Sequence, residues 1–391
     1  MRLVWFRNTV TRRQARRTPS VVSLLAAAGA IGACIAFSVD HGPARSATDQ
    51  DWAPFVLVAG LLLVGLVADE DRVLSAVGTW MARRAKSAVT LYVSAVATVA
   101  VVTALLNLGT SVAFLTPVLV YASRSRGQKV DLLLYGCLLL SNASSVLLPG
   151  SNLTNLIVLG HLHISGGHFL ARMAPAWAAA VLVTADGVGV AERRTLVGSQ
   201  RLRIEPERPV LGVGIVAVAS VTLVVLLSSS PALPVFGIGL AASAIQMSRR
   251  PELRHRVLEA LGLPSLIGLF GVAIALGALG RSWSAPATLM SHLNGWGTAF
   301  LAACSTVALN NLPAASLLAA RVPGHPYSLL VGLDVGPNLF VTGSLAWIIW
   351  LRASKGAGAR PSIAKCSFLG LLCVPLSVAA SEAMLYLTKL L

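Results

Sequence analysis

Long apolar runs, each bounded by polar or basic residues, recur along the chain from Val21 to its C-terminal end. A helix of about 20 apolar residues spans the hydrocarbon core of a bilayer. Residues 41–51 interrupt this pattern and are predicted to form a short external loop. The runs predict nine crossings, at 21–39, 52–68, 131–162, 170–190, 210–227, 234–247, 261–279, 329–351 and 366–387.

Two further apolar runs return to the side from which they start, because basic or polar clusters of the same kind flank both of their ends. Residues 87–123 are interrupted near Asn107, and residues 298–320 are interrupted near Asn310. The second run has only 23 residues for both arms, which is too short for two crossings. Both are therefore predicted to be re-entrant hairpins. Two of the crossings also contain breaks, at 149–152 and 332–343.

The order of these elements occurs twice. Two crossings, an amphipathic stretch, a hairpin, a broken crossing and a last crossing follow each other, and the second copy starts on the opposite side of the membrane. The predicted fold class is an all-α integral membrane protein with two inverted-topology repeats, each with a re-entrant hairpin and a broken transmembrane helix. The predicted parts are a cytoplasmic basic N-terminus (1–20), the first repeat (21–190), a cytoplasmic loop with a linking span (191–232) and the second repeat (233–391).

Composition excludes a water-soluble chain and a nucleic-acid-binding domain. The sequence is 55% hydrophobic and only 12% charged, with a mean hydropathy of +0.76. Its net charge of +16 comes from short basic clusters between apolar runs, as the positive-inside rule requires of a multi-pass protein of the cell (plasma or inner) membrane. The five cysteines form no C-x-x-C pair and have no histidine at metal-ligand spacing, so no metal and no cofactor are predicted.

Inverted repeats with paired Gly/Pro interruptions are typical of secondary transporters, whose substrate sites lie where the broken segments meet. Amide and hydroxyl side chains are concentrated at the four interruptions, whereas an isolated residue such as Ser94 is interpreted as structural. The candidate substrate-binding residues are Asn107, Thr110, Ser111, Ser151, Asn152, Thr154, Asn155, Asn310, Asn311, Asn338, Thr342 and Ser344.

Ionisable side chains inside a membrane are costly and are therefore functional candidates. Asp334 stands between Gly332 and Gly336 in the second break, and we predict that it carries the coupling proton. Asp186 and Glu382, each in the last crossing of its repeat, are weaker candidates.

Four motifs carry a resemblance to a known family: NLGTSVAFLTP (107–117), SNLTNLIV (151–158), NNLP (310–313) and GLDVGPNLFVTGSLAWIIW (332–350). The sequence resembles the arsenical-pump membrane proteins of the ion-transporter superfamily. The resemblance implies arsenical resistance by efflux of arsenite and antimonite in exchange for protons. It also implies that Asn107, Thr110, Asn152, Asn155, Asn310, Asn311, Asp334 and Asn338 line the site. A cytoplasmic ATPase subunit and a homodimer stay open as partners, and the chain itself has no P-loop.

Neither break contains Arg or Lys, which favours the uncharged arsenous acid over an anion. The alternatives within the same fold are a sodium- or proton-coupled carrier of dicarboxylate or other small anions, and a sodium/proton antiporter. A membrane enzyme would need a nucleophile-base pair within the apolar runs, and no histidine lies deep in one. A channel would favour repeats around an axis along the membrane normal.

Overall fold

The computed structural model describes residues 21–160, 162, 164–196, 212–228 and 230–390, and all regular elements within these residues are helices. The predicted N-terminus (1–20) lies outside the described residues, as do residues 197–211 of the predicted cytoplasmic loop. The first half contains α1 (Val21–Val39), α2 (His41–Glu70), α3 (Val73–Arg84), α4 (Ala88–Leu106), α5 (Leu108–Arg124), α6 (Asp131–Ser144), η2 (Pro149–Ser151), α7 (Leu153–Leu159), α8 (Gly166–Ala191) and η3 (Arg193–Thr195). After α9 (Val213–Leu227), the second half contains α10 (Ala232–Arg249), α11 (Leu253–Leu261), α12 (Leu263–Ser282), α13 (Ala285–Ser291), α14 (Gly295–Leu309), α15 (Asn311–Leu318), α16 (Pro326–Val335), η4 (Gly336–Leu339), α17 (Leu345–Gly356) and α18 (Ile363–Leu390).

The predicted fold class is confirmed. The series α1, α2, α3, the α4–α5 hairpin, the broken span α6–η2–α7 and α8 is followed after α9 by α10, α12, α13, the α14–α15 hairpin, the broken span α16–η4–α17 and α18. Among the described residues, five helical segments are long and apolar enough to cross a membrane: α2, α4, α8, the segment Leu253–Ser282 and α18. The protein is therefore a multi-pass membrane protein.

The external loop predicted for residues 41–51 is wrong, because these residues form the first turns of α2. Asp40 caps the helix, and its side chain accepts a hydrogen bond of 3.0 Å from the Gly42 amide. Ala44 and Ala47 are fully buried against α12. Local capping and this packing explain why a polar sequence is helical here.

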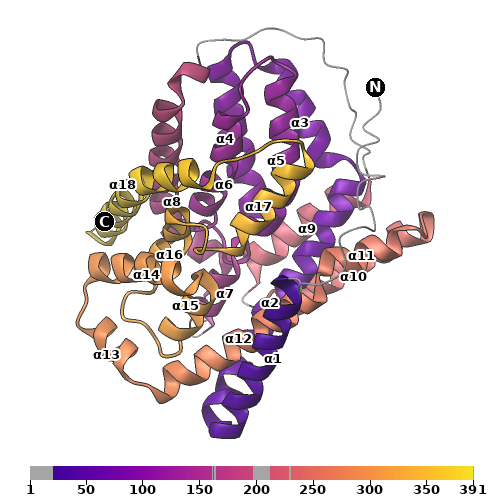
Figure 1. Cartoon of the computed structure of the whole chain (residues 1–391). Helices are drawn as coiled ribbons and strands as arrows, with labels where there is room; N and C mark the ends of the chain where they lie inside the picture. The colour runs from indigo at the N-terminus through magenta and orange to yellow at the C-terminus, as the bar shows by residue number, and fades with distance from the viewer. Residues whose placement is uncertain (1–20, 161, 163, 197–211, 229, 391) are drawn as a thin grey trace.

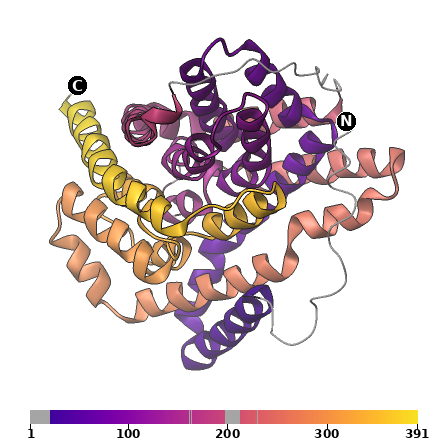
Figure 2. The same cartoon turned by 45° about the horizontal axis from the view of Figure 1, so that its top comes forward.

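The helices divide into two packed groups (Figure 1). In one group, α1 packs on α12, and α2 packs on α9, α10 and α12. Its helices approach closely, since a Cβ atom on Gly271 of α12 would lie 2.2 Å from the carbonyl oxygen of Gly29 in α1. The other group pairs α8 with α18, α14 with α16 and α17 with α5. Figure 2 shows α17 and α18 one after the other across the second group and α12 beside α1 in the first.

The two hairpins enter the second group from different directions. Figure 1 shows α4 and α5 in the upper part of the molecule and α14 and α15 at the lower left. Contacts of α12 with α15 and of α2 with α7 connect the two groups. This arrangement brings both hairpin tips and both helix breaks to the middle of the molecule.

Candidate functional site

The two hairpin tips have the same backbone geometry. Asn107 has φ 95° and ψ 163°, and Asn310 has φ 78° and ψ 152°. Each residue ends one helix and begins the next. The Asn107 side chain caps α5 by accepting a hydrogen bond of 2.9 Å from the Thr110 amide, whereas the Asn310 side chain donates one of 2.9 Å to the Thr342 carbonyl oxygen.

Each helix break is tied to the hairpin of its own repeat. In the first repeat, the Ser151 hydroxyl donates to the Ala104 carbonyl oxygen at 3.2 Å. In the second, the backbone N–H of Asn311 donates to the Gly343 carbonyl oxygen at 2.8 Å, and the Thr342 hydroxyl donates to the Val307 carbonyl oxygen at 2.6 Å. These bonds satisfy backbone groups that would be costly to leave unpaired in a membrane.

All four interruptions meet at one cavity of about 310 Å³. This volume lies at the lower end of the range of about 300–1,000 Å³ that is usual for small-molecule sites. Helices α5, α15 and α17 all begin at its wall, with Leu108, Leu312 and Leu345 in their first turns. The predicted residues that line the cavity are Asn107, Ser151, Asn152, Asn310, Asn311 and Ser344.

Arg352 is the one charged side chain among the described residues that line this cavity, and the sequence analysis did not select it. It follows Leu345 and Ile348 on the same face of α17, at helical spacing. Two indole groups fix the position of α17: Trp347 Nε1 donates to the Pro337 carbonyl oxygen at 2.8 Å, and Trp350 Nε1 donates to the Leu134 carbonyl oxygen at 2.9 Å. In the sequence, Arg352 could have been identified by following the helical spacing from the residues just after the second break, because it lies seven residues after Leu345.

Asp334 lies in the last turn of α16 and not within a break, which corrects the position expected from the sequence. Gly332 and Gly336 allow α16 and η4 to pack closely on α14, since a Cβ atom on Gly332 would lie 2.2 Å from the Ala299 carbonyl oxygen. The Asp334 carboxyl group is fully buried. Its Oδ1 atom accepts hydrogen bonds from Asn152 Nδ2 at 2.8 Å and from Thr154 Oγ1 at 2.6 Å. Asp334 is thus hydrogen-bonded directly to Asn152, which lines the cavity.

The remaining predicted site residues lie behind the cavity wall or beside it. Asn338 exchanges hydrogen bonds with α6, accepting from Asn142 Nδ2 and donating to the Leu139 carbonyl oxygen, both at 2.9 Å. Asn155 donates to the carbonyl oxygens of Ser145 and Leu148, at 2.7 and 3.0 Å. Thr110, Ser111 and Thr154 are buried, and Thr342 is exposed. Asp186 is exposed, and Glu382 is buried and accepts a hydrogen bond of 2.8 Å from Ser328.

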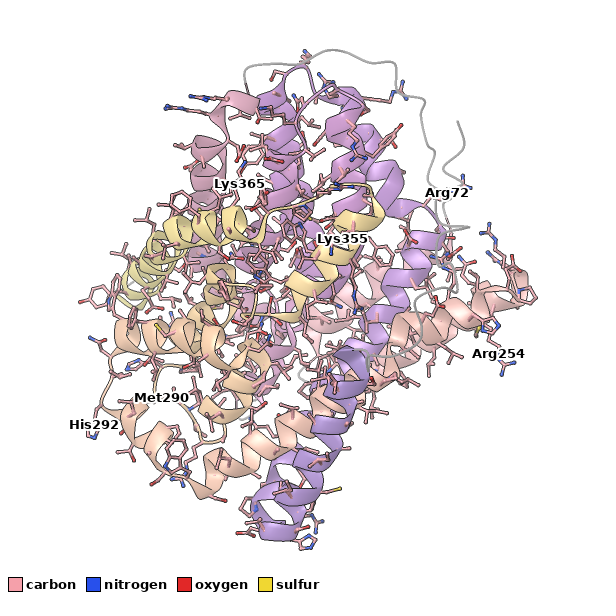
Figure 3. All side chains as sticks on the ribbon, viewed as in Figure 1. Arg72, Arg254, Met290, His292, Lys355 and Lys365 are labelled. Atoms are coloured by element: carbon pink, nitrogen blue, oxygen red, sulfur yellow. The ribbon has the colours of Figure 1, made fainter. Side chains whose placement is uncertain are left out.

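Within the part of the chain that the structure describes, no group of three or more His, Cys, Asp or Glu side chains could hold a metal ion. The site therefore consists of amide and hydroxyl groups, helix N-termini, one cationic side chain and one buried carboxyl group behind them. Figure 3 shows the side chains on the ribbon, with Lys355 and Lys365 in its upper half and Met290 and His292 at the lower left.

Broken helices of two inverted repeats that meet at one cavity define a secondary transporter. Residues 8–348 match the family described as CitMHS, citrate transporter, and the chain belongs to this family. The match supports a membrane transporter of the ion-transporter type and does not single out the arsenical pumps that the motifs resemble.

No curated protein matches the chain. Among solved structures, the chain is similar to the YdaH transporter of Alcanivorax borkumensis, whose crystal structure is described as having an unusual topology. The two are 13% identical, with a TM-score of 0.46 over 86% of this chain and 85% of that chain.

Proposed function

We propose that the protein is a secondary active carrier of a small carboxylate anion, with citrate as the first candidate, and that proton binding at Asp334 drives it. The observation that carries this proposal is the charge of the cavity. Among the described residues that line it, Arg352 is cationic and none is acidic. The family to which the chain belongs bears the description citrate transporter, which agrees with an anionic substrate.

The helix starts add to this positive charge. The first turns of α5, α15 and α17 reach the cavity, and amide groups in a first helical turn lack intrahelical acceptors and carry partial positive charge. The Nδ2 atom of Asn107 is a buried donor without a partner among the described residues, in a side chain that lines the cavity. An arginine can bind a carboxylate through two parallel hydrogen bonds. Together these groups suit a carboxylate better than a neutral solute.

The preference for arsenous acid rested on the absence of Arg and Lys from the breaks. The structure places Arg352 at the cavity from the helix that follows the second break. An uncharged hydroxide needs no counter-charge, whereas an anion would be attracted by the arginine that lines the cavity. Arsenite efflux is therefore the second candidate, to be tested in the same assay.

The test is uptake of radioactive citrate and arsenite into proteoliposomes, with and without an imposed proton or sodium gradient. We expect citrate uptake driven by the proton gradient. Arg352→Gln should reduce citrate uptake by about tenfold or more, because a hydrogen bond to a charged group contributes about 1.5–3 kcal/mol. Arg352→Lys should retain part of the uptake, because it keeps the charge and loses the paired geometry.

Arg360→Gln is the matched control, because Arg360 is exposed and does not line the cavity. It should transport citrate at the wild-type rate. Arsenite flux that is unaffected by Arg352→Gln, together with no citrate flux, would overturn the proposal in favour of arsenical efflux. Flux that follows sodium instead of protons would overturn the coupling through Asp334.

A further inference from the structure

We propose that Gln50 and Arg281 form a latch between the two packed groups of helices. The latch holds the C-terminal ends of α7 and α15, two half-helices that begin beside the cavity, against α2 and α12. It keeps the cavity closed on this side of the molecule and has to open before the cavity can be reached from here. The inference rests on the transporter class and not on the identity of the substrate.

The Gln50 side chain binds the ends of both half-helices at once. Its Nε2 atom donates hydrogen bonds to the carbonyl oxygens of Ile157, in the last turn of α7, at 2.8 Å and of Ala319, which follows α15, at 3.2 Å. Carbonyl groups at the end of a helix lack the usual intrahelical partner, and unpaired backbone groups are costly inside a membrane. One side chain of α2 thus pairs with the ends of two helices from different repeats.

Arg281 holds the Gln50 amide in this orientation. Its Nη2 atom donates to Gln50 Oε1, and its Nη1 atom donates to the Gly277 carbonyl oxygen at 2.9 Å. Because an amide oxygen only accepts and an amide nitrogen only donates, a cation bound to the oxygen directs the nitrogen to the two carbonyl groups. The buried Asp51 carboxyl group attracts the Arg281 guanidinium and helps to keep it in place.

Three hydrogen bonds between the two groups meet at this place. Two are the bonds of Gln50, and in the third Arg321 Nη2 donates to the Arg281 carbonyl oxygen at 2.7 Å. The backbones also approach closely, since a Cβ atom on Gly280 of α12 would lie 2.5 Å from the Leu317 carbonyl oxygen of α15. A movement of α15 away from α12 therefore breaks these contacts together.

The latch lies beyond the part of α12 that borders the cavity. The cavity wall includes residues 260–262, just before α12 begins, and extends along this helix to Leu269. From Leu269 to Arg281, in the last turn, the helix rises by about 18 Å at 1.5 Å per residue. Among the described residues, neither Gln50 nor Arg281 lines the cavity. In Figure 1, α12 runs from α11 to α13 at the lower left.

This position gives the latch a role in the transport cycle. Transporters built from inverted repeats expose their site to the two sides of the membrane in turn, by movement of one bundle against the other. The latch joins the two groups on the side away from the start of α12, so its loss should favour the state in which the cavity opens there. Two hydrogen bonds correspond to about tenfold or more in an equilibrium constant.

The experiment measures how fast a cysteine in the cavity wall is labelled from each face of the membrane. Leu345→Cys is introduced into the full-length protein, with the exposed Cys34 and Cys304 replaced by alanine. A membrane-impermeant maleimide is added to intact cells or to inverted membrane vesicles. The basic cluster before α12 is expected to be cytoplasmic, so wild type should react faster in inverted vesicles. Gln50→Leu should raise the rate in intact cells about tenfold and reduce it in inverted vesicles.

Gly280→Ala opens the latch without changing its side chains, because the added Cβ atom would push α12 away from α15. It should change the two labelling rates in the same directions as Gln50→Leu. The matched controls are Asp49→Ala, at an exposed position in the same turn of α2, and Gly237→Ala, whose Cβ atom would have no heavy atom within 4 Å. Both should be labelled at wild-type rates.

Wild-type labelling rates in folded Gln50→Leu or Gly280→Ala protein would overturn the latch. Equal increases from both faces would overturn it too, because they would indicate a general loosening of the packing. Thermal unfolding shows which variants are folded, and the second variant keeps the test decisive if the first does not fold. The labelling needs no substrate, so a lack of citrate transport would refute the proposed function and not the latch.

Discussion

Two asparagines show how single residues shape this site. Asn107 and Asn310 have positive φ with extended ψ, a backbone region that is essentially restricted to glycine. Asn107 compensates for this geometry by capping α5, and Asn310 by bonding to the Thr342 carbonyl oxygen. Glycine would accept the backbone but could make neither side-chain bond. The residues are thus specified by backbone shape and by side-chain chemistry together.

This balance predicts that two substitutions at Asn107 differ in stability. Asn107→Ala loses the cap and keeps the strained backbone, so the free energy of unfolding should fall by about 1–3 kcal/mol. Asn107→Gly relieves the strain and loses only the cap, so it should be clearly more stable than the alanine variant. Thermal unfolding in detergent measures both. Equal stability of the two variants would contradict the assigned role of the backbone geometry.

At the scale of elements, the position of the second break depends on how closely η4 approaches α18. A Cβ atom on Gly370 of α18 would lie 1.8 Å from the Asn338 carbonyl oxygen. Asn338 in turn pairs with Asn142 of the first broken span. One close helix contact therefore holds the two broken spans in register.

Gly370→Ala should push η4 away from α18 and separate Asn338 from Asn142. We expect a loss of about 1–3 kcal/mol in the free energy of unfolding, as for other overpacked sites, and a fall in citrate uptake. Gly237→Ala is the control, because a Cβ atom at Gly237 has no heavy atom within 4 Å. Thermal unfolding and proteoliposome uptake should both distinguish the two variants; unchanged uptake in Gly370→Ala would show that this register is not needed for transport.

At the scale of the whole molecule, the distribution of basic clusters along the sequence predicts how the protein is oriented in its membrane. By the positive-inside rule, we expect the N-terminus and the segment containing Lys355 to be cytoplasmic and α13 to be external. In Figure 3, Lys355 lies in the upper half and His292, which follows α13, at the lower left. Both side chains are exposed.

Cysteine labelling tests this orientation. In a background where the exposed Cys34 and Cys304 are replaced by alanine, His292→Cys should react with a membrane-impermeant maleimide in intact cells. Lys355→Cys should react only after the cells are permeabilised. The reverse pattern would invert the proposed topology without changing the fold.

The sequence by itself determined the class of protein, because a bilayer restricts the length and polarity of the segments that cross it and the backbone conformations that they can adopt. Crossings need long apolar runs, and interruptions need residues such as Asn, Gly and Pro. The hairpins near Asn107 and Asn310 and the order of the two repeats could therefore be predicted. The helical start of α2 could not, because its capping and its packing on α12 are not visible in an apolar pattern.

Only the tertiary structure decided which polar groups face the cavity and which satisfy the protein. Asn152 and Asn155 have the same chemistry and neighbouring positions, yet Asn152 lines the cavity and Asn155 binds backbone carbonyl oxygens. Asn152 and its partner Asp334 are 182 residues apart, and the position of Arg352 depends on how α17 is anchored. An amide or a charge has the same local sequence signature whether its partner is a substrate or the protein, so only three-dimensional pairing distinguishes the two roles.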